Sequence, residues 1–254
     1  MKALNPVVWL VWSLAAMFIV VTTRNPLYLA LTGGALVAVY LAMHRSSIAG
    51  AAWRTFLRIG IVIAALNIAF NLLTVHVGDR VLAWLPSGLP IFGGAITFNA
   101  LIYGLITALA LLDLLLIAAI FSTAVNRAAL LRLLPGQFAA LGVAGIVALS
   151  FLQKTLLALP FGFTAVLVLW QLMAPQAGRR GRYRPVSWER VDWLQIAAAA
   201  LAITLYGASL ILLPDVLAYY PYPRLTAPPF SLWPGIACLL LVMPALAGAR
   251  RDAS

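Results

Sequence analysis

The chain has 254 residues, of which 64% are hydrophobic and only 9% are charged, and its mean hydropathy is +1.03. Soluble domains are about 45–50% apolar and about 25% charged, so this composition excludes a water-soluble globule and indicates an integral membrane protein. The net charge of +11 comes from short clusters of Lys and Arg between apolar stretches rather than from one basic face. This distribution argues against a nucleic-acid-binding protein.

Apolar stretches that approach the roughly 20 residues needed to cross a bilayer predict the membrane spans. Six are clear, at about Val7 to Val21, Leu27 to Met43, Ile59 to Val75, Ile96 to Thr123, Leu194 to Leu213 and Leu232 to Leu246. The apolar region from Phe138 to Met173 is divided by Lys154 and Pro160, and it adds two spans if it forms a hairpin or none if it faces the cytoplasm. We therefore expect an all-α fold, a polytopic helical bundle with six to eight transmembrane helices in one integral membrane domain over residues 1–254.

The positions of Lys and Arg predict the orientation, because basic loops stay on the cytoplasmic side. With the N-terminus inside, most of the 17 cations fall in cytoplasmic segments. They are Lys2, Arg45, Arg54, Arg58, Arg127, Arg132, Arg179, Arg180, Arg182, Arg184, Arg190, Arg250 and Arg251. The other side holds Arg24, Arg80, Lys154 and Arg224. We expect a multi-pass protein of the cell inner (plasma) membrane with both termini cytoplasmic and the first helix retained.

The loop from Pro214 to Pro229 is rich in proline and tyrosine, which predicts an ordered, non-helical cap on the outer face. Catalytic motifs are missing from the sequence. His44 and His76 fall at opposite membrane faces, Cys238 is the single cysteine, and no paired acids, nucleophilic serine motif or phosphate-binding loop is present. We expect no enzymatic activity, no cofactor and no metal site.

Asp113 is the only acid deep within a predicted span. A carboxyl group there costs about 2.5–3.5 kcal/mol on insertion scales, so it should face the bundle and have a partner. It is either a proton or substrate site or a structural group bonded to Asn67, Asn71 or Asn99. Asn67 and Asn71 lie one turn apart and are expected to join helices.

Small residues are expected to let helices pack closely in lipid. They include Gly33 with Gly34, Gly93 with Gly94, Gly104, and Gly142 with Gly145.

Four arginines stand within residues 179–184, directly after a long apolar stretch. One interpretation is that Arg179, Arg180, Arg182 and Arg184 are positive-inside charges that meet anionic lipid headgroups. The other is that one of these guanidinium groups docks in an acidic groove of a cytoplasmic partner, where it can pair with a carboxylate through two hydrogen bonds.

The order of features along residues 4–184 resembles the transmembrane T component of energy-coupling factor (ECF) transporters, the family that includes the cobalt permease Q subunit. The matching features are Leu4-Asn5-Pro6, Arg24-Asn25-Pro26-Leu27, the patch Trp53 to Arg58, Leu66-Asn67, Gly93 to Thr97, Tyr103-Gly104-Leu105, Ser122-Thr123, the segment Arg127 to Pro135 and Gln176 to Gly181. The last of these is similar to the family's Ala-Gln-x-x-Arg-Gly coupling motif.

The resemblance implies that cytoplasmic coupling helices, here in residues 124–190, insert arginines into two cytoplasmic ABC ATPase subunits. On this basis Arg180 and Gly181 match the Arg-Gly pair, and Arg179 replaces the usual alanine. Ala249 with Arg250 is a second candidate motif, and Arg127 and Arg132 belong to the short amphipathic segment. Residues 191–254 would form a C-terminal transmembrane hairpin.

The function implied by the resemblance is a coupling subunit of a vitamin or metal-ion importer. It would transmit the movement of the two ATPases to a separate substrate-binding membrane subunit in the lipid bilayer. The alternative from the residues themselves is a self-sufficient secondary transporter or channel that uses the intramembrane Asp113. A membrane scaffold without transport activity is a third possibility.

Overall fold

The computed structural model describes residues 5–43, 50–86, 88, 92–125 and 188–246. The chain divides into two compact units, one made of Met1–Thr123 with Trp188–Ser254 and the other of Ala124–Ser187. Apart from two residues at the start of the second unit, the described residues all belong to the first.

Each of the first two helices begins at an Asn-Pro pair. Helix α1 runs Pro6–Thr22 and α2 runs Pro26–Met43. The Oδ1 atom of Asn5 accepts a hydrogen bond of 3.0 Å from the backbone N–H two residues ahead, and that of Asn25 makes the same bond at 3.0 Å. Asparagine suits this position because it satisfies a free N–H of the first turn, and the proline that follows needs no partner for its nitrogen.

The next two helices are joined through a small β-hairpin. Helix α3 runs Gly50–Thr74 and α4 runs Phe98–Ala124, while strands β1, Val81–Leu85, and β2, Gly94–Thr97, pair antiparallel between them. The other regular elements of the described residues are all helices, as predicted, and this hairpin is the exception. A connection of this length must satisfy its backbone N–H and C=O groups, and short strand pairing does so.

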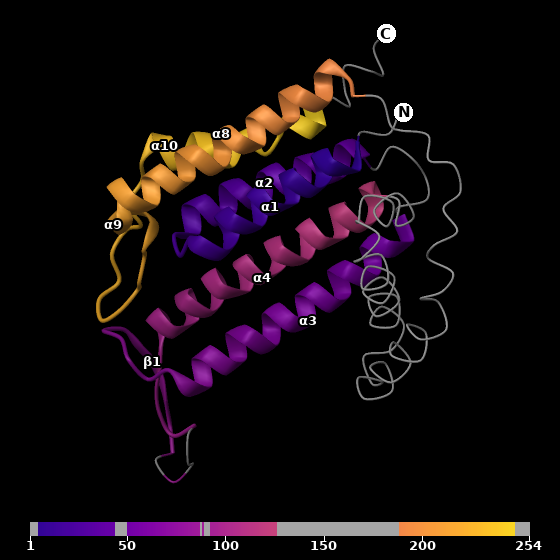
Figure 1. The fold of residues 1–254 in the computed structure, drawn as a ribbon. Coiled ribbons are helices and arrows are strands. Elements are labelled where there is room, and N and C mark those ends of the chain that lie inside the picture. The colour runs from indigo at the N-terminus through magenta and orange to yellow at the C-terminus, as the bar shows by residue number, and fades with distance from the viewer. Residues whose placement is uncertain (1–4, 44–49, 87, 89–91, 126–187, 247–254) are drawn as a thin grey trace, which may run out of the picture. The chain divides into compact units, whose positions relative to one another are not determined.

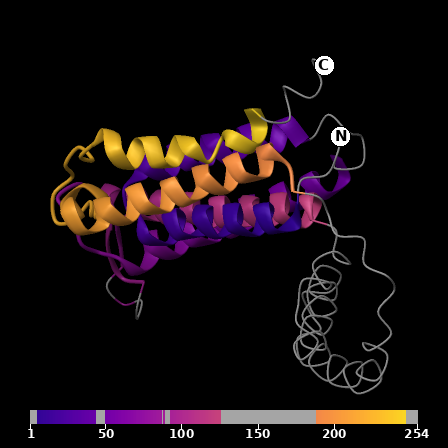
Figure 2. The same ribbon diagram turned by 45° about the horizontal axis from the view of Figure 1, so that its top comes forward.

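The C-terminal part of the described chain folds back along the first helices. Helix α8, Arg190–Leu212, is followed by the short helix α9, Pro214–Leu217, and then by α10, Leu232–Leu240. Figures 1 and 2 both show α8 beside α10, and α8 also packs against α1 while α10 packs against α2. The predicted cap from Pro214 to Pro229 is ordered, but α9 makes its first residues helical.

Helix α10 ends at Leu240, and after a turn at residues 241–242 the chain is helical again over 243–246, so the span predicted to Leu246 is interrupted. The cause is Pro244, which has no N–H for the carbonyl of Leu240 and would collide with it in a continuous helix. The chain forms a tight turn here, in which the Leu241 N–H donates to the Cys238 carbonyl, three residues back, at 3.2 Å. The Leu241 carbonyl instead accepts a 2.9 Å hydrogen bond from the indole Nε1 of the buried Trp12 in α1.

Three of the described helices, α2, α4 and α8, are long and apolar enough to cross a membrane. Helix α1 and residues Arg58–Thr74 of α3 are apolar but shorter. Exposed apolar side chains on α3, such as Val62, Leu66 and Phe70, are each more than half accessible. Such a surface is unfavourable in water and normal in lipid. The described helices therefore belong to a membrane protein, with fewer clear spans than the six to eight predicted.

Candidate functional site

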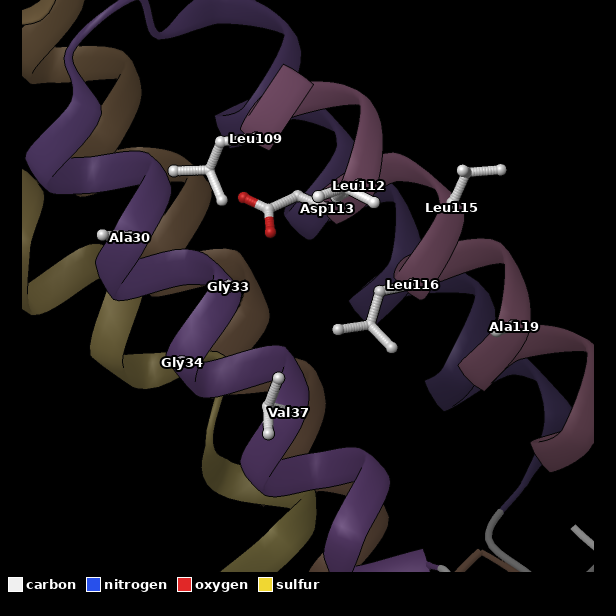
Figure 3. A pocket seen from close by; sticks show the side chains of 10 residues that line it. All are labelled: Ala30, Gly33, Gly34, Val37, Leu109, Leu112, Asp113, Leu115, Leu116 and Ala119. Carbon is white, nitrogen blue, oxygen red and sulfur yellow. The ribbon is translucent and has the colours of Figure 1, made fainter. Parts of the chain in front are cut away.

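The candidate site is centred on Asp113, near the middle of α4. The residue lies about 22 Å along the helix axis from Phe98, so both ends of α4 are more than two turns away. Its side chain is only 3% exposed, and its Oδ2 atom has no hydrogen-bond partner. Figure 3 shows the carboxyl group directed from α4 toward α2.

A pocket of about 400 Å³ lies between α2 and α4, next to this carboxyl group. The α2 wall consists of Ala30, Gly33, Gly34 and Val37, and the α4 wall is mostly leucine. Among the described residues that line the pocket, Asp113 alone has a polar side chain. The pocket is therefore an apolar space with one carboxyl group at its wall.

Gly33 makes room for this carboxyl group. A Cβ atom added at Gly33 would lie 2.7 Å from Asp113 Oδ1, closer than any normal contact. A Cβ at the neighbouring Gly34 would meet nothing within 4 Å. The sequence suggested that both glycines serve helix packing. In the structure only position 33 needs a glycine, because a Cβ there would collide with Asp113.

Asn67 and Gly104 hold α3 against α4. The amide Nδ2 of Asn67 donates to the Gly104 carbonyl at 3.1 Å and to Thr107 Oγ1 at 2.7 Å. A Cβ at Gly104 would lie 3.1 Å from the Cα of Ile68, so the glycine allows the two backbones to approach. The amide of Asn71 bonds within its own helix instead, because its Nδ2 donates at 2.9 Å to the Asn67 carbonyl of α3.

Replacing Asn67 by alanine should lower the thermal unfolding midpoint of the purified chain more than replacing Asn71. The first change removes two bonds between helices, worth about 0.5–2 kcal/mol together, and leaves Thr107 without this donor. The matched Asn71→Ala variant removes a bond within one helix only. Equal losses in the two variants would contradict a joining role for Asn67.

The asparagines suggested as partners of Asp113 bond elsewhere. Asn67 bonds to Gly104 and Thr107, Asn71 bonds within its own helix, and Asn99 donates to Asp79 at 2.9 Å and to the Pro221 carbonyl at 2.6 Å. The interpretation in which Asp113 forms a structural hydrogen bond with one of these three asparagines is therefore wrong. The carboxyl group instead points to the opposite neighbour, α2 (Figure 3).

Two buried asparagines organise the end of the bundle that carries the hairpin and α9, which we call the loop end. Asn25 is 0% exposed, and its Nδ2 donates at 2.7 Å to each of two carbonyls, those of Val216 and Pro229. Asn99, also fully buried, bonds the 218–231 loop to the α3–β1 connection through Asp79. The loop is therefore fixed to the helices by amide groups.

The hydrogen bond from the Asn99 amide lowers the pKa of Asp79 below its usual value of 3.8. Backbone hydrogen bonds and the charge of Arg80 make smaller contributions in the same direction. A lowered folded-state pKa means that the carboxylate stabilises the fold above the unfolded-state pKa and that this contribution is lost as the pH falls. The wild-type unfolding midpoint should therefore fall further between pH 5 and pH 3 than that of Asp79→Asn. Identical pH dependence in both proteins would refute this role.

Sequence reasoning missed a second acidic contact, at the end of the bundle away from the loop end. Asp192 is buried at the start of α8, where its Oδ2 accepts a 3.0 Å hydrogen bond from the backbone N–H of Glu189. Its Oδ1 accepts from the N–H of Asn5 at 3.4 Å and so connects the starts of α1 and α8. The spacing Glu189-x-x-Asp192 before an apolar run was the available signal.

The predicted coupling residues lie outside the described residues. These are Arg127, Arg132, Arg179, Arg180, Gly181, Ala249 and Arg250, and His44 is outside as well. Among the described residues, no group of three or more His, Cys, Asp or Glu side chains could hold a metal ion. The Asp113 pocket is thus the site whose chemistry the described chain presents.

Comparison of the chain with protein-family profiles, with curated proteins and with solved structures found no match.

Proposed function

We propose that this chain is the transmembrane coupling subunit of an ECF-type importer. In this role it crosses the plasma membrane six to eight times with both termini in the cytoplasm, and it has no catalytic chemistry of its own. It passes the ATP-driven movement of two cytoplasmic ABC ATPases to a separate membrane subunit that binds a vitamin or a metal ion. The observation that carries the proposal is the order of family-like features along residues 4–184.

Several of these features stabilise the described helices or the contacts between them, which supports the proposal. Asn5 and Asn25 cap α1 and α2. Asn67 and Gly104 meet at the contact between α3 and α4. A subunit that transmits movement needs helices that move as units, and polar bonds between closely packed helices provide such stiffness.

The proposed contact with the ATPases rests on Arg180 and Gly181, with Arg179 beside them, and on Arg250 after Ala249. A guanidinium group can make two parallel hydrogen bonds to a carboxylate, which gives a coupling contact both strength and direction. Arg127 and Arg132 would contribute to the same contact with the ATPases.

One observation favours a second function, that of a self-sufficient secondary transporter. A carboxyl group deep in a membrane helix, with its Oδ2 atom lacking a hydrogen-bond partner, is costly and is typical of proton and substrate pathways. In this alternative, Asp113 binds and releases the transported species, and no ATPase is needed.

Affinity purification of the tagged chain from its native membrane in mild detergent separates the two functions. A coupling subunit should bring two ATPases with it, and Arg180→Ala combined with Arg250→Ala should remove them. Arg224→Ala, an exposed arginine at the loop end, is the matched control and should retain them. Purification of the wild-type chain alone, with transport that is lost in Asp113→Asn, would refute the coupling function and support the second one.

A further inference from the structure

We propose that the pocket between α2 and α4 binds a small amphiphilic amine, with the ammonium group on Asp113 and the apolar body against the leucines of α4. The coupling function proposed above does not require such a site, because a coupling subunit leaves substrate choice to another protein. The inference therefore goes beyond that function and concerns the described residues only.

The size and lining of the pocket suit a small molecule. Its volume of about 400 Å³ falls in the range of roughly 300–1,000 Å³ found for ligand sites, which are mostly apolar with a few polar groups. The lining residues of α2 and those of α4 recur at helical spacing, so each helix contributes one continuous wall. Within the described residues, the Ala30, Gly34 and Val37 side of the pocket is exposed.

The chemistry of the wall selects the kind of ligand. Glycine, alanine, valine and leucine offer no side-chain donor, and the main-chain N–H groups of the lining residues lie within helices. The buried Asp113 Oδ2 therefore lacks a donor, and leaving such a group unpaired in an apolar site is costly. A protonated amine supplies both the N–H donor and the positive charge that an ionised carboxylate needs.

The same wall disfavours other ligands. An anion would meet the carboxyl group without any cation beside it, and a sugar would bury several hydroxyl groups with one partner between them. A neutral alcohol can donate one hydrogen bond but brings no charge. The structure thus assigns the site to cations that carry an N–H group on an apolar body.

The test uses the full chain in lipid nanodiscs, with 4-phenylbutylamine as the probe and empty nanodiscs as the reference for partitioning into lipid. We expect saturable binding of one amine per chain. Asp113→Asn should weaken binding by at least about tenfold, since the amide keeps an acceptor oxygen but loses the negative charge that pairs with the ammonium group. The neutral analogue 4-phenylbutan-1-ol should bind the wild-type chain at least about tenfold more weakly than the amine.

Two glycine variants separate the pocket from general effects on folding. Gly34→Leu fills the pocket with a side chain whose Cβ meets nothing within 4 Å, and it should abolish binding without the collision that a Cβ at Gly33 makes with Asp113. Gly207→Leu, in α8, fills open space elsewhere and should leave binding unchanged. Both variants should elute as folded chains in size-exclusion chromatography.

The proposal is overturned if the amine only partitions into lipid, if Asp113→Asn binds as tightly as wild type, or if Gly34→Leu still binds. It is also overturned if a membrane helix of a co-purified subunit cross-links at position 34 and the amine neither binds nor displaces it. These results are independent of ATPase capture, so failure of this inference is distinct from failure of the coupling function.

Discussion

Replacing Gly33 by alanine is expected to destabilise the folded chain by about 1–3 kcal/mol, the usual range for overpacking of a close-packed interior. The added Cβ would lie 2.7 Å from Asp113 Oδ1, so the carboxyl group or the helices must move. Relief of the contact requires the carboxyl group to rotate from its present position toward the adjacent pocket, or the two helices to move apart. The midpoint of thermal unfolding in detergent measures the effect.

The neighbouring glycine provides the control. Gly34→Ala meets nothing within 4 Å and should cost far less, because the two variants differ only in the collision with Asp113. The collision should also disappear when Asp113 is replaced by alanine. Gly33→Ala should then cost less in the Asp113→Ala background than in wild type. Equal costs in both backgrounds would show that Gly33 does not accommodate the carboxyl group.

Asn25→Ala should be at least as damaging, with an expected loss of about 2–5 kcal/mol. The variant removes the N-cap of α2, and it leaves the carbonyls of Val216 and Pro229 without the donor that each now has at 2.7 Å. Cap loss costs about 1–2 kcal/mol, and each of the two part-buried hydrogen bonds that is lost adds about 0.5–1.5 kcal/mol. The loop end should become susceptible to proteolysis under conditions in which the wild type is protected.

The Asn25→Asp variant separates the two contributions. It keeps an oxygen that can cap α2 but loses both N–H donors, so it should be nearly as unstable as Asn25→Ala. Wild-type stability and protease resistance in Asn25→Asp would mean that the bonds to the loop contribute little.

The positions of the helices could be predicted because lipid imposes a simple length rule. The predicted spans from Val7 and Leu27 begin one residue inside α1 and α2, where the Asn-Pro pairs mark the helix starts. The span predicted from Ile59 to Val75 agrees with the apolar stretch Arg58–Thr74, although α3 itself already starts at Gly50. The cations Arg54 and Arg58 led to the later start, although a helix can continue past the charges that end an apolar run.

The partners of individual polar residues could not be predicted in the same way. Asp113 and Gly33 are 80 positions apart, and no local pattern states which face of α4 meets α2. The asparagines of α3 and α4 appeared suitable partners by composition, but Asn67 and Asn99 are already used by Gly104, Thr107 and the loop end. Pairing between helices depends on packing geometry, which a single sequence does not contain.

The orientation of the chain tests the proposed coupling function most directly, because the ATPases can reach Arg180 only if residues 179–184 face the cytoplasm. Cys238 is the single cysteine, so Cys238→Ala provides a background without thiols. In that background, Tyr220→Cys and Gly181→Cys place one thiol at the exposed loop end and one in the arginine cluster. Labelling with a membrane-impermeant maleimide then reports the side of each.

In intact cells we expect labelling of the Tyr220→Cys variant, and we expect labelling of Gly181→Cys only after the membrane is permeabilised. Labelling of Gly181→Cys in intact cells, with Tyr220→Cys protected, would place the arginine cluster outside the cell and contradict the coupling function.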